Sequence, residues 1–134
     1  MSQPTADDLR RAPLLASLDD DARELLASSF EITKYPNGER IIVEGASGHD
    51  LYIVDRGRAI ATQRELGLVG MIGPGDFFGE IAPLGRRERT ATVTASTPMV
   101  VWVLDERATQ RLRIDHPEVA DALNTAMQDH LAAD

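Results

Sequence analysis

The spacing of hydrophobic positions changes twice along the chain. Near the N-terminus, Ala22, Leu25 and Leu26 recur at the three-to-four-residue spacing of a helix, which predicts a helix over 19–29. Ser17 and Asp20 have the spacing of a capping box at its start, with Asp where Glu or Gln is usual. The chain is therefore expected to open with helical structure over 1–29.

From Phe30 onward, short apolar runs alternate with turn residues. Gly, Pro, Asn and Asp cluster at 36–38, 45–48, 56–57 and 73–76, and such clusters mark turns between strands. Short strands at regular spacing favour an antiparallel barrel or sandwich over 30–104, and we expect a jelly-roll-like β-barrel. We expect seven strands, at 31–35, 40–44, 51–55, 58–64, 68–72, 90–95 and 99–104.

Helical spacing returns after the last predicted strand. Asp105 is placed to cap a helix that runs through Arg113, and Pro117 is placed at the first position of a second helix. The predicted fold is mainly β: one domain over 1–134, with a barrel between an N-terminal helix and two C-terminal helices over 105–134. The second helix carries an apolar stripe of Ala120, Leu123, Met127 and Leu131.

Composition narrows the range of functions. The 134 residues include 22 acidic and 14 basic side chains, for a net charge of −8. Such a surface repels polyphosphate, so we expect no nucleic-acid binding by this chain alone and no membrane partner. There is no cysteine, the N-terminus is polar and acidic, and no apolar run approaches the ~20 residues of a membrane span. We expect a cytoplasmic protein.

Enzymatic chemistry has no visible basis in the sequence. His49, His116 and His130 lie in different segments, so neither a metal site nor a nucleophilic triad is predicted. Trp102, the single tryptophan, is expected to anchor the core. We therefore predict a protein that is not an enzyme and holds no metal.

The residues from 75 to 91 carry the chemistry of an anion site. Gly79 allows a ligand to approach the backbone closely, and the residues after it can form a helical turn whose free amides face an anion. The guanidinium of Arg89 matches two phosphate oxygens, and an ionised Glu80 accepts from sugar hydroxyls. Together these groups predict a pocket for a ribose that bears a phosphate.

This stretch resembles the phosphate-binding cassette of the cyclic-nucleotide-binding domain family. The cassette pattern is matched by Phe-Gly-Glu-Ile-Ala at 78–82 and Arg-Thr-Ala at 89–91. The segments 45–57 and 73–76 also resemble the family, and the likeness extends from Leu14 to Leu131. Three features depart from the pattern: Glu88 replaces a common proline, Pro83 follows the motif, and the loop at 65–67 is short.

The resemblance implies a role for each cassette residue. Arg89 would bind the cyclic phosphate together with the backbone amides of Ile81 and Ala82. Glu80 would accept from the ribose 2′-hydroxyl, and Gly79 would contact the ribose through its backbone. The ligand would be cyclic AMP by preference, with cyclic GMP as an alternative.

The resemblance also implies how the base is held and how binding is transmitted. Thr90 would contact the phosphate or a syn guanine, and Ala61, Val69 and Ile72 would form the base-facing wall. The C-terminal helices would act as hinge and lid, moving when the nucleotide binds. Two alternatives stay open: the sensor half of a larger transcription regulator, and an interaction module that binds no nucleotide. The effector is not predicted.

Overall fold

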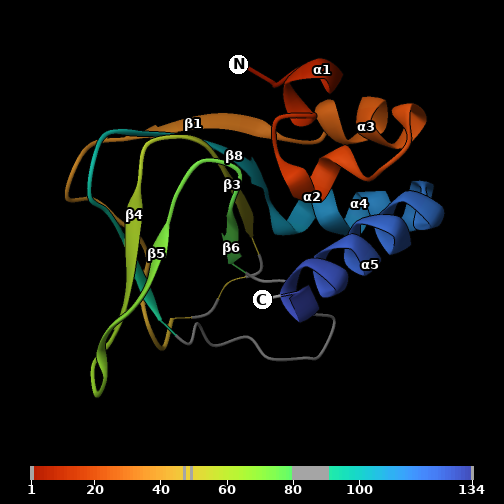
Figure 1. The fold of residues 1–134 in the computed structure, drawn as a ribbon. Coiled ribbons are helices and arrows are strands. Elements are labelled where there is room, and N and C mark those ends of the chain that lie inside the picture. Colours follow the sequence, from red (N-terminus) through yellow and green to blue (C-terminus); the bar gives the residue numbers. More distant parts are fainter. Residues whose placement is uncertain (1, 47, 49, 80–90, 134) are drawn as a thin grey trace.

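Two four-stranded antiparallel sheets face each other, and the helices gather at one end of them (Figure 1). The protein is described by a computed structural model over residues 2–46, 48, 50–79 and 91–133, with residues 128–133 described by their backbone alone. One sheet has the strand order β1-β8-β3-β6 and the other β2-β7-β4-β5. The strands are β1 (Glu31–Tyr35), β2 (Arg40–Ile42), β3 (Leu51–Arg56), β4 (Ala59–Gln63), β5 (Gly67–Ile72), β6 (Phe77–Gly79), β7 (Thr92–Ala95) and β8 (Met99–Leu104).

The seven predicted strands are confirmed, with their ends shifted by a few residues. The structure adds β6, which is too short to show the alternation that identifies a strand in a sequence. The predicted jelly-roll fold is also confirmed, although its barrel is open. Within the described residues, no ladder of hydrogen bonds joins the two sheets.

The N-terminal region contains three helices instead of one. The predicted helix is α3 (Asp20–Ala27), and two single-turn helices precede it, α1 (Ala6–Leu9) and α2 (Pro13–Ala16). At four residues each, α1 and α2 cannot display a helical period. The predicted cap was wrong, because the Asp19 carboxylate accepts from the Ala22 amide, while the Ser17 hydroxyl donates to the Leu14 carbonyl.

The two C-terminal helices are confirmed as α4 (Glu106–Asp115) and α5 (Pro117–Ala133). The Asp105 carboxylate caps α4 by accepting from the Ala108 amide at 2.7 Å. Pro117 opens α5, as expected. Of the predicted stripe on α5, Leu123 and Met127 are buried and Ala120 packs against the core, whereas the Leu131 side chain lies outside the described part.

The buried side chains form two clusters. One joins the helices to the outer face of the first sheet and includes Phe30, Ile53 and Trp102. The other fills the space between the sheets and includes Tyr52 and Val101. Trp102 is 1% exposed, which confirms it as a core anchor. Among the described residues, no helix has the length and apolar character needed to cross a membrane.

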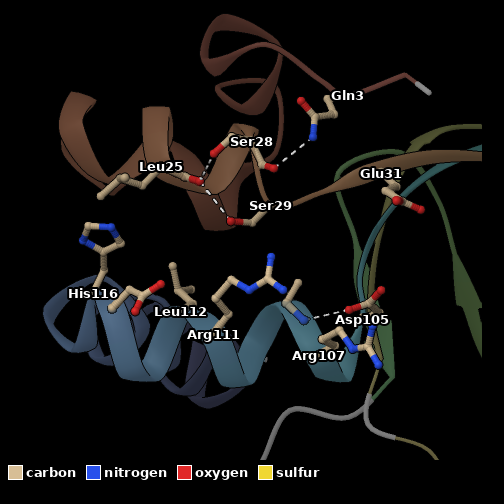
Figure 2. Close-up of a pocket in the computed structure, with 12 residues that line it drawn as sticks. Gln3, Leu25, Ser28, Ser29, Glu31, Asp105, Arg107, Arg111, Leu112 and His116 are labelled. Carbon is tan, nitrogen blue, oxygen red and sulfur yellow. Dashed lines mark hydrogen bonds between the residues drawn. The ribbon is translucent and has the colours of Figure 1, made fainter.

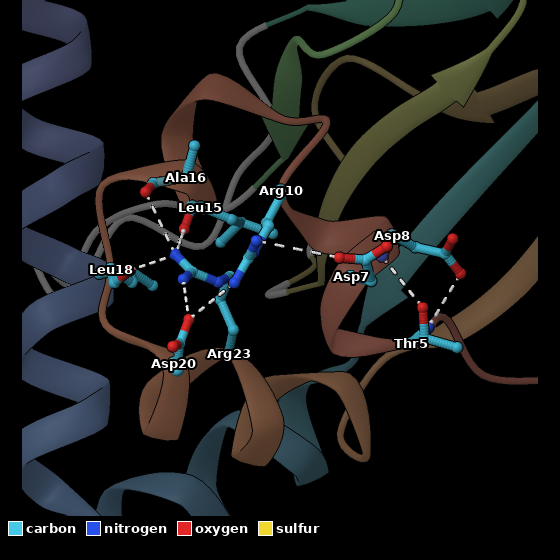
Figure 3. Close-up of polar contacts among 9 residues, drawn as sticks. All are labelled: Thr5, Asp7, Asp8, Arg10, Leu15, Ala16, Leu18, Asp20 and Arg23. Carbon is cyan, nitrogen blue, oxygen red and sulfur yellow. Dashed lines mark hydrogen bonds and ion pairs between the residues drawn. The ribbon is translucent and has the colours of Figure 1, made fainter.

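A buried arginine fixes the N-terminal helices. Figure 3 shows the Arg23 guanidinium among the carbonyl oxygens that end α2: it donates to Leu15 and Ala16, both at 3.2 Å, and to Leu18. It also pairs with Asp20. These carbonyls lie at or just after the end of α2, where the regular helical hydrogen bonds stop, and Arg23 supplies them with side-chain donors.

We expect Arg23→Ala to lower the free energy of unfolding by about 2–3 kcal/mol, because hydrogen bonds to a buried charged group are lost. Urea denaturation measures the loss. Arg10→Ala is the matched control, since Arg10 pairs with the same Asp20 but is largely exposed and should change stability by less than about 1 kcal/mol. Equal losses would contradict a special role for Arg23.

The Arg23–Asp20 pair also predicts an acid dependence. Hydrogen bonds from Arg23, and then from Arg10, lower the pKa of Asp20 below its ordinary 3.8. The resulting stabilisation is complete above pH 3.8 and disappears as the pH falls through the lower pKa of the folded state. The melting temperature should therefore fall more steeply between pH 4 and 2, as rough bounds, in the natural protein than in Asp20→Asn.

Candidate functional site

The entry to the predicted cassette is a turn fixed to β3. The Asp76 carboxylate accepts from the Gly73 amide at 2.8 Å, which closes the turn. Backbone hydrogen bonds then join the turn to Val54 of β3: the Gly75 amide donates to the Val54 carbonyl at 2.8 Å, and the Val54 amide donates to the Asp76 carbonyl at 2.9 Å. The chain therefore enters β6 from a defined direction.

Strand β6 delivers Gly79 to the edge of the first sheet. Phe78 stacks on Tyr52 of β3, with ring centroids 4.9 Å apart and planes 10° from parallel, and Gly79 lies opposite Leu51. Gly79 has φ +105°, a conformation that residues with a Cβ rarely adopt. The structure thus adds a second reason for glycine at position 79, beside the close approach of a ligand that the sequence suggested.

The remaining cassette residues lie outside the described part of the chain. Position 79 is the last described residue before the segment 80–90 and Ala91 is the first after it. The chain leaves the first sheet at β6 and joins the second at β7. The roles of five residues stay predictions, as does the ribose contact of Gly79: these are Glu80, Ile81, Ala82, Arg89 and Thr90.

The three predicted base-wall residues lie on β4 and β5. Ala61 and Ile72 pack against the cluster between the sheets, while Val69 is 45% exposed. Ala61 pairs with Gly70 and Thr62 pairs with Leu68, so Val69 is the extra residue of a β-bulge. The short loop at 65–67 is therefore accommodated by a bulge that sets Val69 apart from the other two.

Sequence reasoning missed contacts that only strand pairing reveals. Tyr52 supports Phe78 by stacking, yet 26 positions of sequence separate the two. Near the start of β7, the Thr92 hydroxyl accepts from the Glu44 amide at 2.9 Å. The Glu44 carboxylate in turn accepts from the Arg64 amide, which ties the β4–β5 hairpin to the same region.

Metal chemistry finds no support in the part of the chain that is described. No group of three or more His, Cys, Asp or Glu side chains there is arranged to hold a metal ion. His116 lies 3.7 Å from the Glu118 carboxylate, a contact between neighbouring positions at the start of α5.

Comparisons with known proteins agree with this geometry. Residues 32–116 match the cyclic nucleotide-binding domain family. The chain is 37% identical over 123 residues to a cAMP-dependent protein kinase regulatory subunit of Eremothecium gossypii. That match covers 86% of this chain and 27% of the relative, so the chain spans about a quarter of the relative's length.

Two solved structures extend the likeness to the fold. The N-terminal domain of a transcriptional regulator from Streptomyces coelicolor A3(2) is 32% identical, with a TM-score of 0.77, over 95% of this chain and 92% of that one. The regulatory domain of Toxoplasma gondii PKA, crystallised with cAMP, is 26% identical, with a TM-score of 0.76, over 92% and 48%. The chain belongs to the cyclic nucleotide-binding domain family.

Proposed function

We propose that this chain is a non-catalytic regulatory module that binds cyclic AMP in preference to cyclic GMP and signals through its C-terminal helices. The observation that carries the proposal is Gly79, which ends β6 at φ +105° directly before the Glu-Ile-Ala of the cassette motif. Because glycine has no side chain, a ligand can approach the backbone closely at this position.

The proposed binding mode divides the nucleotide among three sets of groups. Arg89 and the amides of Ile81 and Ala82 hold the cyclic phosphate, and Thr90 lies beside it. Glu80 accepts from the ribose 2′-hydroxyl, because an ionised carboxylate is an acceptor only. The base lies against the wall formed by Ala61, Val69 and Ile72.

The preference for cyclic AMP rests on the relatives. The Eremothecium protein is named for its cAMP dependence, and the Toxoplasma domain was crystallised with cAMP. The hydroxyl of Thr90 is the feature of this chain that favours cyclic GMP, since it offers a hydrogen bond to a syn guanine. We place the activity in the cytoplasm, where cyclic nucleotides act as signals.

Signalling requires that the nucleotide favour one arrangement of the C-terminal helices over another. Helix α4 follows β8 directly, and the Asp50 carboxylate just before β3 accepts from the Glu106 amide at its first turn. This bond links the sheet that carries Gly79 to the start of α4. We propose that closure of the site moves α4 as a hinge and α5 as a lid.

Titration calorimetry with cyclic AMP, cyclic GMP and AMP tests the proposed function. We expect cyclic AMP to bind more tightly than cyclic GMP, and AMP to bind far more weakly, because the cassette fits a cyclic phosphodiester. A thermal-shift assay gives an independent reading, since a ligand at about 100 times its dissociation constant adds about 2.7 kcal/mol of stability. If the folded protein binds neither cyclic nucleotide, the interaction-module alternative replaces this proposal.

The second candidate is the sensor half of a transcription regulator. It is favoured by the Streptomyces structure, the N-terminal domain of such a regulator, of which this chain covers 92%. In that case a DNA-binding effector would act on the same movement of α4 and α5. A mobility-shift assay with this chain alone should show no DNA binding at net charge −8, whereas a longer gene product with a DNA-binding domain would show it.

A further inference from the structure

A groove separates α3 from α4 on the side of the molecule that carries the helices (Figure 2). Its volume is about 390 Å³, within the range of roughly 300–1,000 Å³ that is typical of small-molecule sites. Among the described residues, none of the predicted cassette or of the base wall lines it. Its walls come from the N-terminal segment, the end of α3, the start of β1 and one face of α4.

The groove has an apolar floor and a wall of hydroxyl groups. Leu25, Ala108 and Leu112 provide the apolar surface. The hydroxyls of Ser28 and Ser29 both donate to the Leu25 carbonyl, at 2.9 and 3.0 Å. Their donors are therefore occupied and their positions are fixed, so this wall of the groove is formed before any ligand arrives.

Two arginines of α4 line the groove, and neither side chain is paired within the part of the chain that the structure describes. Figure 2 shows Arg111 pointing from α4 toward Ser29. Between described residues, no hydrogen bond or ion pair involves the side chain of Arg107 or Arg111. By contrast, Arg10 and Arg11, between α1 and α2, and Arg23 of α3 each pair with a carboxylate. A guanidinium at an apolar groove is suited to a planar oxyanion, which it binds through two parallel hydrogen bonds.

The carboxylates that line the groove do not form ion pairs with the guanidinium groups of Arg107 and Arg111. Three carboxylates line the groove: Glu31 and Asp105 at one end, past Arg107 (Figure 2), and Asp115 one turn after Arg111 on α4. The Asp105 carboxylate already accepts from the first turn of α4, and no ion pair joins Asp115 to Arg111. Around Arg111, the labelled neighbours across the groove are the neutral Ser28 and Ser29. The Arg111 guanidinium therefore keeps its donors available to an anion in the groove, although carboxylates line the groove too and the protein as a whole is acidic.

We propose that this groove is a second ligand site, for a small organic oxyanion: a phosphate or carboxylate joined to an apolar body. The Arg111 guanidinium holds the oxyanion, and Leu25 and Leu112 pack against the apolar body. Arg107 adds a second positive charge one turn away. The site is separate from the proposed nucleotide site and does not depend on nucleotide binding.

Phenyl phosphate is the probe, because it combines both features of the ligand class. Titrated into the ¹⁵N-labelled full chain without nucleotide, it should shift the amides of Ser28, Ser29, Arg111 and Leu112 and saturate at millimolar concentration. Inorganic phosphate lacks the apolar body and phenol lacks the charge, so each should bind at least about fivefold more weakly.

Arg111→Gln should weaken phenyl phosphate binding at least about fivefold, while Arg113→Gln should leave it unchanged. Arg113 is the matched control, since it lies on the same helix and is exposed but does not line the groove. Arg89→Ala should also leave these shifts unchanged, which separates this site from the cassette. Unsaturable shifts, shifts confined to the cassette, or equal losses in the Arg111 and Arg113 variants would overturn the proposal.

Discussion

Arg89→Ala is expected to weaken cyclic AMP binding by at least tenfold without unfolding the protein. The guanidinium is the only side-chain cation that the family pattern assigns to the cyclic phosphate, and it offers two parallel donors to two phosphate oxygens. A charge-assisted contact of this kind contributes about 1.5–3 kcal/mol, and 1.4 kcal/mol corresponds to about a tenfold change in affinity. Titration calorimetry on the two proteins measures the ratio.

Two further variants identify which property of Arg89 matters. Arg87→Ala removes a charge from the same run of residues, where no contact with the phosphate is predicted, so affinity should change by less than about threefold. Arg89→Lys keeps the charge but loses the two parallel donors of the guanidinium. Its affinity for cyclic AMP should lie between those of the natural protein and Arg89→Ala. If Arg89→Ala and Arg87→Ala behave alike, the phosphate is not held by the residue at position 89.

Gly57→Ala is expected to produce the largest loss of stability in this chain. Gly57 lies in the turn between β3 and β4 with φ +92°. A Cβ there would collide with the Pro98 carbonyl oxygen and would lie 2.8 Å from the Met99 Cα. Both obstacles are backbone atoms at the start of β8, so relief requires moving a strand. We expect a loss of more than about 3 kcal/mol, from left-handed strain and overpacking together.

Gly38→Ala separates the two contributions. Gly38 has the same φ of +92°, but a Cβ there would meet no atom within 4 Å. The free energy of unfolding of this variant should therefore fall only by the cost of left-handed backbone strain, about 1–2 kcal/mol. Urea denaturation of both variants gives the difference, which is the cost of the contact with β8. A Gly57→Ala protein as stable as Gly38→Ala would show that this contact is relieved without cost.

Part of the candidate site could be predicted from the sequence, and part of it could not. The cassette was found because its residues are close together: Gly79, Glu80 and the amides after it belong to one short motif, and Arg89 follows it closely. The Tyr52–Phe78 stack and the hydrogen bond from the Glu44 amide to the Thr92 hydroxyl join residues 26 and 48 positions apart. No local pattern specifies which of many distant residues will meet, so such contacts needed the fold.

The sequence by itself determined seven strands, the helices α3, α4 and α5, and the cassette motif. The signals for these elements are alternating apolar residues, capping residues and turn residues, and each of them is contained within a few positions. The tertiary structure alone decided the short elements α1, α2 and β6, the bulge at Val69 and the open groove at Arg111. A single turn or a three-residue strand has too little period to be recognised, and its stability comes from packing against distant residues. Arg23 illustrates the reason: its position in the predicted helix does not show that it is buried, because the carbonyls that accept from it belong to the end of another helix.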